Sequence, residues 1–212
     1  MNDLTVPEKL AKLRELMTNQ SIDALVVMSA DPHMSEYLPD YWKARQWLSG
    51  FSGSVGTLVV TQNFAGLWAD GRYWVQAEQQ LAGTGFQLQK LTSDESSTHL
   101  AWIEKNLPAG SVISVNGQTL SIQQFKALEN TAKQCGFKLE TRQDLIGSIW
   151  SNRPELPLEQ IHLMPEGLNA LSRKEKIQAI RETLKTKAIE GHFISSLDDI
   201  AWVLNARGQD VE

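Results

Sequence analysis

The chain has 212 residues, of which 42% are hydrophobic and 21% charged, a composition typical of globular domains. This length allows one full domain and part of a second, with a core that needs neither disulfides nor a structural metal. The formal net charge of −5 and the lack of clustered Lys and Arg argue against a nucleic-acid partner. No apolar run approaches the roughly 18 residues that a membrane span needs, so no membrane association is expected.

The amino terminus and the cysteine content bear on where the protein is found. Residues 1–4 lack the basic and apolar regions of a signal peptide. The lone Cys135 has no partner for an intrachain disulfide, which fits a reducing compartment. We therefore expect a cytoplasmic protein in which Cys135 is a structural residue.

The first predicted elements alternate between helix and strand. Residues 7–20 predict an amphipathic helix, because their leucines recur at three- and four-residue spacing and proline suits the first turn. The apolar run 24–28 predicts a buried strand, and residues 29–53 are expected to be irregular. Two further strands, over residues 55–61 and 65–69, are expected to form a hairpin.

The same alternation continues to residue 150. Asp70 is expected to cap a helix that ends near residue 81. Strands are predicted over residues 86–91, 112–115 and 138–140. Helices are predicted from Ser97 or Thr98 to residue 107, over residues 121–134 and over residues 144–150. This order predicts an α/β domain over residues 1–150, with a mixed β-sheet flanked by helices on both faces.

A second unit is predicted after a linker. Residues 151–158 are expected to be extended, because two prolines three apart exclude a regular helix or a central strand. Beyond them the sequence predicts a helix over 173–189, a strand over 192–195 and a helix over 198–205. One strand between two helices leaves both of its edges unpaired. The strand must then join the sheet of the first domain or find its partners in residues absent from the chain. We favour the second alternative and expect residues 159–212 to be the start of a second, similar α/β domain.

Local motifs give little sign of catalysis. The histidines of the chain are His33, His99, His162 and His192. They are scattered, and none lies at helical spacing with a carboxylate as a zinc or manganese site would require. Residues 31–36 are the only local cluster of acids with histidine, and a hydrogen-bonded loop is expected there. The glycine-rich residues 50–57 lack the lysine of a P-loop and precede a strand, so tight turns with positive φ are expected.

Residues 68–74 (WADGRYW) stand apart from these segments. If Asp70 is the N-cap, Arg72 lies in the first helical turn, where the helix dipole disfavours a cation by about 0.3–1 kcal/mol. A carboxylate should compensate, either from this chain in a structural salt bridge or from a ligand. The residues alone favour the salt bridge.

Two of the seven tryptophans are expected to differ in exposure. Trp68 lies in a strand pattern and is predicted to pack the turn of Arg72 against the core. Trp47 lies in the irregular segment with Trp42 and Tyr41. We expect it to be partly exposed and to serve an interface with another domain or subunit, the alternative being that both tryptophans are core residues.

Taken together, these segments resemble the Xaa-Pro aminopeptidases of the creatinase and prolidase superfamily, in particular the three-domain cytosolic form. The matching segments, in chain order, are residues 31–37 (DPHMSEY), Gly50-Phe51, Gly53-Ser54, Gly56-Thr57, Trp68, residues 70–73 (DGRY), Ile149-Trp150, Arg153-Pro154, residues 196–202 (SLDDIAW), Asn205 and Arg207-Gly208. Each segment is weak alone, but their order and spacing from about residue 5 onward make the resemblance specific.

The resemblance implies two similar amino-terminal α/β domains, the first with a ribonuclease-H-like motif, followed by a catalytic domain with two divalent cations, usually manganese. We expect that catalytic domain to be absent from this chain, so no catalytic or metal-binding residue is assigned here. For the intact enzyme it implies metal-assisted cleavage of proline-containing peptides before a penultimate proline, by a homodimer. It also makes Arg72 the residue that reaches substrate at the rim of the active site.

Other functions remain open at this point. The chain could belong to a related hydrolase of the superfamily, such as a prolidase or a creatinase-like enzyme, or be a stand-alone binding or oligomerisation module. A ribonuclease-H-type nuclease is disfavoured by the acidic balance and the lack of a recognisable carboxylate constellation. On the favoured interpretation, this chain by itself is expected to hydrolyse no Xaa-Pro peptide.

Overall fold

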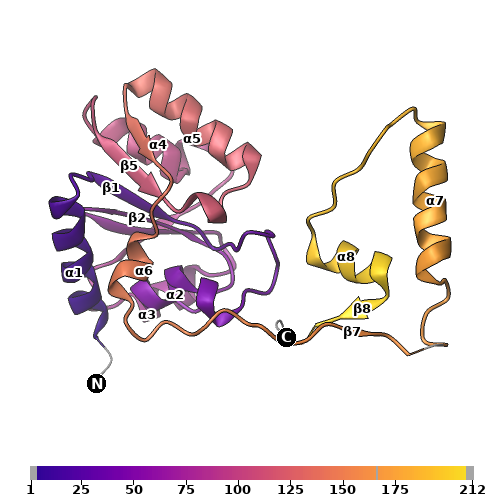
Figure 1. The fold of residues 1–212 in the computed structure, drawn as a ribbon. Helices are drawn as coiled ribbons and strands as arrows, with labels where there is room; N and C mark the ends of the chain where they lie inside the picture. Colours follow the sequence, from indigo (N-terminus) through magenta and orange to yellow (C-terminus); the bar gives the residue numbers. More distant parts are fainter. Residues whose placement is uncertain (1–3, 166, 209–212) are drawn as a thin grey trace.

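The computed structural model describes residues 4–165 and 167–208, and a six-stranded mixed sheet lies at the centre of its amino-terminal part (Figure 1). The strand order is β4-β3-β2-β1-β5-β6. The strands are β1 (Ala24–Val27), β2 (Thr57–Thr61), β3 (Ala65–Ala69), β4 (Gln87–Lys90), β5 (Val112–Val115) and β6 (Lys138–Glu140). β2 runs antiparallel to β1 and β3, whereas β4, β5 and β6 each run parallel to their inner neighbour.

Helices cover both faces of this sheet (Figure 1). One face carries α1 (Val6–Asn19), α2 (Ala44–Ser49), α3 (Trp74–Gln80) and α6 (Leu145–Ile149), and the other carries α4 (His99–Asn106) and α5 (Ile122–Cys135). Successive residues of a strand point to opposite faces. Leu25 and Val27 accordingly lie in the core under α1, and Ala24 and Val26 in the core under α5. The predicted mixed α/β fold is confirmed.

Capping residues set several helix starts where the sequence predicts them. Thr5 begins α1 with a capping box to Glu8, and Ser121 begins α5 with a capping box to Gln124. Thr98 caps α4 by accepting a hydrogen bond from the backbone N–H of Ala101. These starts follow from local side-chain chemistry, so the sequence is enough to place them.

The segment expected to be irregular contains helical structure. A 3₁₀ helix spans Asp40–Trp42 and α2 follows directly. α2 buries Arg45 and Ser49 beside Leu48, so its inward face is largely polar. A hydrophobic period cannot mark a helix whose buried residues are polar, and the prediction was therefore wrong here.

The start of α3 also differs from the prediction. Asp70 does not cap the helix, whose N-cap is Tyr73. Instead Asp70 Oδ1 accepts a hydrogen bond at 3.0 Å from the backbone N–H of Arg72, two residues further on, which forms an Asx-turn. Aspartate often bonds to nearby backbone in this way and so competes with helix formation. Arg72 therefore lies in the turn before α3 and not in the first turn of the helix.

The C-terminal region (residues 159–165 and 167–208) holds α7 (Arg173–Thr186) and α8 (Leu197–Leu204). Its strands are β7 (His162–Leu163) and β8 (Ala206–Arg207), which pair antiparallel. The strand predicted over residues 192–195 is wrong, because that stretch is irregular and leads into α8, whose cap is Ser196. The predicted domain limits at residues 150 and 158 stay a prediction.

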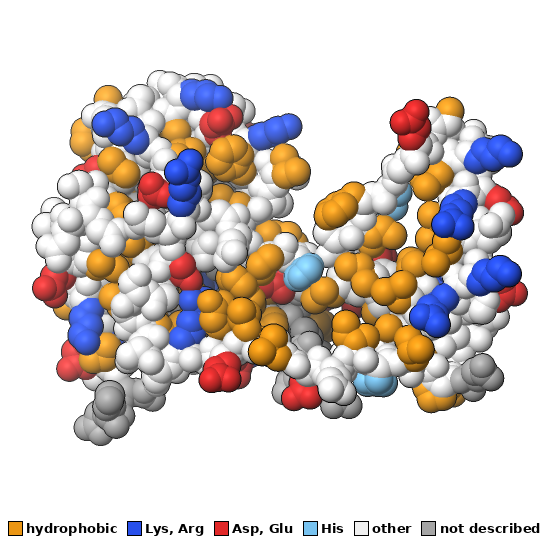
Figure 2. Space-filling model, viewed as in Figure 1, with side chains coloured by type: hydrophobic (Ala, Val, Ile, Leu, Met, Phe, Trp, Pro, Cys, Tyr) orange, Lys and Arg blue, Asp and Glu red, His pale blue; other side chains and the backbone are white. Residues whose placement is uncertain are grey.

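The C-terminal region has little core of its own. Of its described residues, only Lys176 and Ala206 are buried, and Phe193 is 88% exposed. Figure 2 shows apolar side chains gathered around the hollow between α7 and α8. Lys176 joins the two helices by donating to the carbonyl oxygen of Trp202 (2.7 Å) and to Asn205 Oδ1 (2.5 Å). In the described ranges, no helix is both long and apolar enough to cross a bilayer.

Candidate functional site

The segments that carry the resemblance in the first 150 residues meet mostly at one edge of the sheet. β1 and β3 run in one direction and β2 in the other, so the end of β1, the start of β2 and the end of β3 share an edge. Residues 29–37 follow β1, residues 50–56 precede β2, and residues 70–73 follow β3. Each segment is visible in the sequence, but only the strand register brings the three together.

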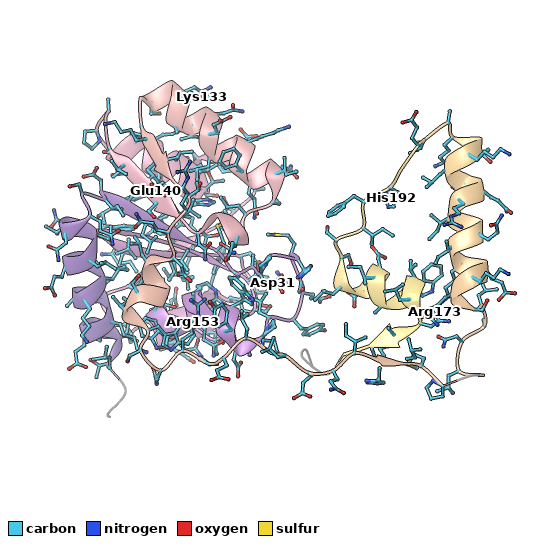
Figure 3. The ribbon with its side chains drawn as sticks, viewed as in Figure 1. Asp31, Lys133, Glu140, Arg153, Arg173 and His192 are labelled. Atoms are coloured by element: carbon cyan, nitrogen blue, oxygen red, sulfur yellow. The ribbon has the colours of Figure 1, made fainter. Side chains whose placement is uncertain are left out.

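The first segment is a loop organised by Asp31. This carboxylate is 2% exposed, and its Oδ1 accepts hydrogen bonds at 2.9 Å from the backbone N–H groups of His33 and Ser35. The predicted hydrogen-bonded loop is thereby confirmed. Figure 3 shows Asp31 on the side of the sheet that faces the C-terminal region. His33 Nδ1 lies 2.9 Å from the carbonyl oxygen of Ser195, which links the loop to that region.

Arg45 joins this loop to the glycine-rich segment, although no pattern in the sequence predicts that role. Its side chain is buried, with Nε donating to Ser29 Oγ (2.5 Å), Nη1 to the carbonyl oxygen of Phe51 (2.9 Å) and Nη2 to that of Gly53. All three acceptors are neutral, and burial lowers the pKa of Arg45 to about 10, so the guanidinium stays charged at neutral pH. The one sequence feature that indicates burial of Arg45 is its three-residue spacing from Leu48, which places both side chains on the same face of a helix.

The glycine-rich segment packs against the turn that carries Arg72. Ser54 Oγ and the Tyr73 hydroxyl lie 2.6 Å apart, and the rings of Phe51 and Tyr73 meet edge to face at 5.9 Å. A Cβ on Gly53 would lie 2.3 Å from Phe51 Cζ and 2.8 Å from Tyr73 Cδ1. Positive φ, expected here, is found at Gly50 (φ +75°), whereas Gly53 is required because no side chain fits.

Arg72 is exposed and held in one orientation by Asp70. Its Nε and Nη2 donate to the two carboxylate oxygens of Asp70 at 3.0 and 2.9 Å, and 68% of its side chain is exposed. These hydrogen bonds lower the pKa of Asp70 and raise the pKa of Arg72. The salt bridge that the residues alone favoured is therefore present. The arginine side chain carries five N–H donors, and Asp70 accepts hydrogen bonds from only two of them. A role of Arg72 toward substrate stays a prediction.

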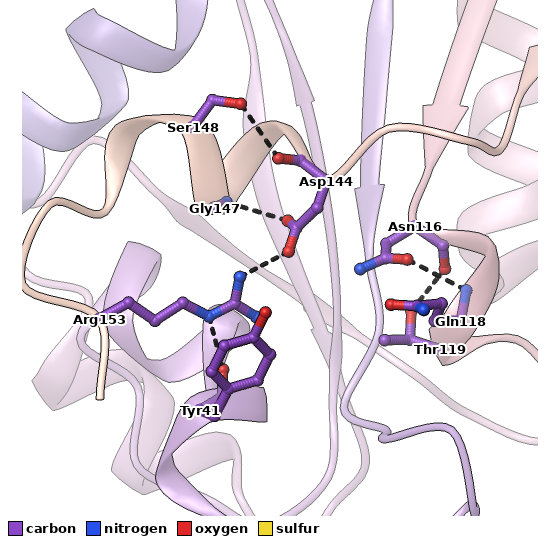
Figure 4. Close-up of polar contacts among 8 residues, drawn as sticks. All are labelled: Tyr41, Asn116, Gln118, Thr119, Asp144, Gly147, Ser148 and Arg153. Atoms are coloured by element: carbon purple, nitrogen blue, oxygen red, sulfur yellow. Dashed lines mark hydrogen bonds and ion pairs between the residues drawn. The ribbon is translucent and has the colours of Figure 1, made fainter. Parts of the chain in front are cut away.

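Arg153 lies beside Asp144 and Tyr41, at the start of the predicted linker (Figure 4). Its Nη1 donates to Asp144 Oδ2 at 2.5 Å, and its Nε donates to the carbonyl oxygen of Tyr41 at 2.8 Å. Asp144 also caps α6 through the backbone N–H of Gly147. Only 10% of the Arg153 side chain is exposed. The residue thus anchors the chain where it leaves the sheet.

The tryptophans divide as predicted in burial. Trp68 is 3% exposed and lies in the core under α4 and α5. Trp47 is half-buried, and its ring stacks on Trp150 with the centroids 5.0 Å apart and the planes at 16°. Its proposed interface with another domain or subunit stays a prediction.

Metal ligands do not gather in the part of the chain that the structure describes. In residues 4–165 and 167–208, no group of three or more His, Cys, Asp or Glu side chains is placed to hold an ion. The manganese pair implied by the resemblance stays a prediction.

Comparison with known proteins covers the whole chain. Residues 9–144 match the family model described as the creatinase/prolidase N-terminal domain, and residues 152–212 match a second model with the same description. The probable Xaa-Pro aminopeptidases P of Neosartorya fischeri and Aspergillus flavus are each 35% identical over 213 residues. The alignment takes in 100% of this chain and 32% of each relative, so the chain spans about a third of their length.

Solved structures give the same result. The X-prolyl aminopeptidase of Caenorhabditis elegans, described as a cytosolic enzyme with a di-nuclear active site, superposes with a TM-score of 0.88 at 34% identity. That match covers 98% of this chain and 35% of the other. The Xaa-Pro aminopeptidase of Streptococcus thermophilus has a TM-score of 0.52 at 19% identity, over 68% of this chain and 97% of the other, and shares the fold. The chain belongs to the creatinase/prolidase N-terminal domain family, in the form found in the amino-terminal part of Xaa-Pro aminopeptidases.

Proposed function

We propose that this chain is the non-catalytic amino-terminal region of a cytoplasmic, homodimeric metalloaminopeptidase that removes the residue before a penultimate proline. Within that enzyme the region contributes to substrate access and to oligomer contacts, and Arg72 contacts the peptide at the rim of the active site. Two divalent cations, manganese in this proposal, would supply an activated water for the hydrolysis. Their ligands are not among the residues assigned here.

The observation that carries the role of Arg72 is an exposed guanidinium on a braced turn. Asp70 fixes the fork through two hydrogen bonds, and Tyr73, tied to Ser54 at 2.6 Å, fixes the turn. Holding a donor group in place before the substrate arrives reduces the entropy lost on binding. The remaining N–H groups suit a peptide carbonyl or carboxylate, which a fork binds with fixed orientation and lysine does not.

The test uses an enzyme that contains this chain and has the full length of its relatives. It is assayed with a Xaa-Pro peptide in the presence of manganese. Arg72→Ala should lower kcat/KM roughly ten- to hundred-fold, as expected for one charge-assisted contact. Arg72→Lys should recover little of that loss, and Arg142→Ala, a change at an exposed arginine elsewhere, should leave kcat/KM near the wild-type value. A variant with a lower Tm but unchanged kcat/KM would return Arg72 to a purely structural salt bridge.

A second measurement addresses the absence of catalysis from this region. The purified 212-residue chain with added manganese should not hydrolyse a Xaa-Pro peptide above a blank without protein. Turnover that is abolished by a chelator would contradict the non-catalytic role.

A further inference from the structure

A mostly apolar pocket opens at the same edge of the sheet, bordered by α4 and α5. Its volume is about 320 Å³. Its wall includes Met28, Trp68, His99, Leu100, Leu120 and Leu128. Pockets of this size, apolar with a few polar groups, are typical of sites for small ligands and side chains.

The pocket lies next to the exposed guanidinium. Arg72 is not part of the wall, but Asp70 is, and the Asp70 carboxylate accepts hydrogen bonds from Arg72 Nε and Nη2 at 3.0 and 2.9 Å, which brings the fork next to the pocket rim. Nε and Nη2 are engaged by Asp70, and no hydrogen bond to Nη1 is found within residues 4–165 and 167–208. An anion at the rim can therefore be bound through Nη1 while the pair with Asp70 persists.

The small number of charged side chains in the pocket wall favours an apolar ligand group over a charged one. Among the described residues that line the pocket, Asp70 and His99 are the only acidic or basic side chains. Burial lowers the pKa of His99 to about 4, so its imidazole is neutral at physiological pH. An anionic group inside would lose its hydration without gaining a cationic partner in the wall, and a cationic group would have to compete with Arg72 for Asp70. An apolar side chain would gain about 25 cal/mol for each Å² removed from water.

We propose that the pocket binds the apolar side chain of a peptide's C-terminal residue while Arg72 binds the terminal carboxylate. This inference deepens the proposed function, on which its relevance to catalysis rests, by naming a substrate class. The preferred substrates would be Xaa-Pro peptides that end in an aromatic or large aliphatic residue. A charge at the rim beside an apolar cavity is the arrangement that such an end group requires.

The binding test uses the 212-residue chain and needs no catalysis. Three probe peptides are titrated by NMR: N-acetyl-Gly-Gly-Phe with a free carboxylate, the same peptide as an amide, and N-acetyl-Gly-Gly-Gly with a free carboxylate. We expect the first to bind roughly tenfold more tightly than either of the others, because each control lacks one of the two contacts. Equal affinities for the three, or no binding of the first, would overturn the proposal.

Variants then separate the two contacts. Ala127→Phe places a ring at an exposed position of the wall and should abolish the preference for Phe over Gly, whereas Lys126→Phe, one residue away and outside the wall, should not. Arg72→Ala should abolish the preference for acid over amide and keep the preference for Phe. If Ala127→Phe binds all three probes as wild type does, the pocket is not the site.

The failure of this inference is distinguishable from that of the proposed function. A family-length enzyme that cleaves Xaa-Pro peptides regardless of their last residue would contradict the pocket assignment alone. An enzyme that cleaves no Xaa-Pro peptide would contradict the proposed function, and the affinities of the isolated chain would still decide about the pocket.

Discussion

The guanidinium carbon of Arg153 lies 3.7 Å from the centre of the Tyr41 ring. The same fork donates to Asp144 and to the carbonyl oxygen of Tyr41, so it holds the 3₁₀ helix Asp40–Trp42, the cap of α6 and the start of the linker together. A largely buried cation in this setting should contribute to stability and to the direction in which the chain leaves the sheet.

Arg153→Ala should lower the free energy of unfolding by about 2–3 kcal/mol, because it leaves Asp144 without its partner and opens a gap against Tyr41. At this chain length the Tm should fall by roughly 5–10 °C. Limited proteolysis should then cleave residues 151–158 faster, as followed by gel and mass spectrometry. Arg142→Ala is the control at an exposed site. Unchanged Tm and cleavage rate in the Arg153 variant would show that the cluster stabilises nothing.

Gly53→Ala should destabilise the candidate site through its shape alone. The new Cβ would lie 2.3 Å from Phe51 Cζ and 2.8 Å from Tyr73 Cδ1, so both rings must move, at a cost of about 1–3 kcal/mol. Gly71→Ala is the matched control, because its nearest neighbour would be Trp74 Cζ2 at 4.0 Å and its φ is not positive. Chemical denaturation of both variants gives the comparison. Equal stabilities would contradict close packing at Gly53.

His99 should make stability depend on pH. Burial lowers its folded-state pKa to about 4 from an ordinary value of 6.5, so the unfolded chain binds more protons between these values. Its contribution to stability is fully present above pH 6.5 and is lost as the pH falls towards 4, by about 2–3 kcal/mol in all. In His99→Gln this part of the slope should vanish, whereas His162→Gln, at an exposed site, should keep it. Unfolding in urea at several pH values provides the test.

Lys176→Met should loosen the C-terminal region and leave the sheet intact. The Lys176 ammonium group joins α7 to the end of α8 and lies 4.4 Å from the centre of the Trp202 ring. Methionine retains the apolar stem but none of the donors, so hydrogen exchange should quicken in α8 and not in β1. Lys174→Met, at an exposed position of the same helix, is the control. Faster exchange throughout the sheet would contradict this local role.

The sequence by itself determined the elements whose signals are local. Caps such as Thr98 and Ser121 accept hydrogen bonds from backbone N–H groups three residues on, and buried strands such as 24–27 show as short apolar runs. These signals were sufficient for the α/β class, and the order of the motifs was sufficient for the family. They do not depend on how distant segments pair.

Only the tertiary structure decided the site. Arg45 is polar and reads as a surface residue, yet carbonyl oxygens 6 and 8 residues away satisfy its guanidinium inside the protein. Asp70 has the chemistry of a helix cap, yet it bonds to Arg72 in the preceding turn. The meeting of residues 29–37, 50–56 and 70–73 depends on the antiparallel register of β1, β2 and β3. Such contacts join residues far apart along the chain or choose between two local bonds of similar energy, so they follow from packing and not from any pattern within one segment.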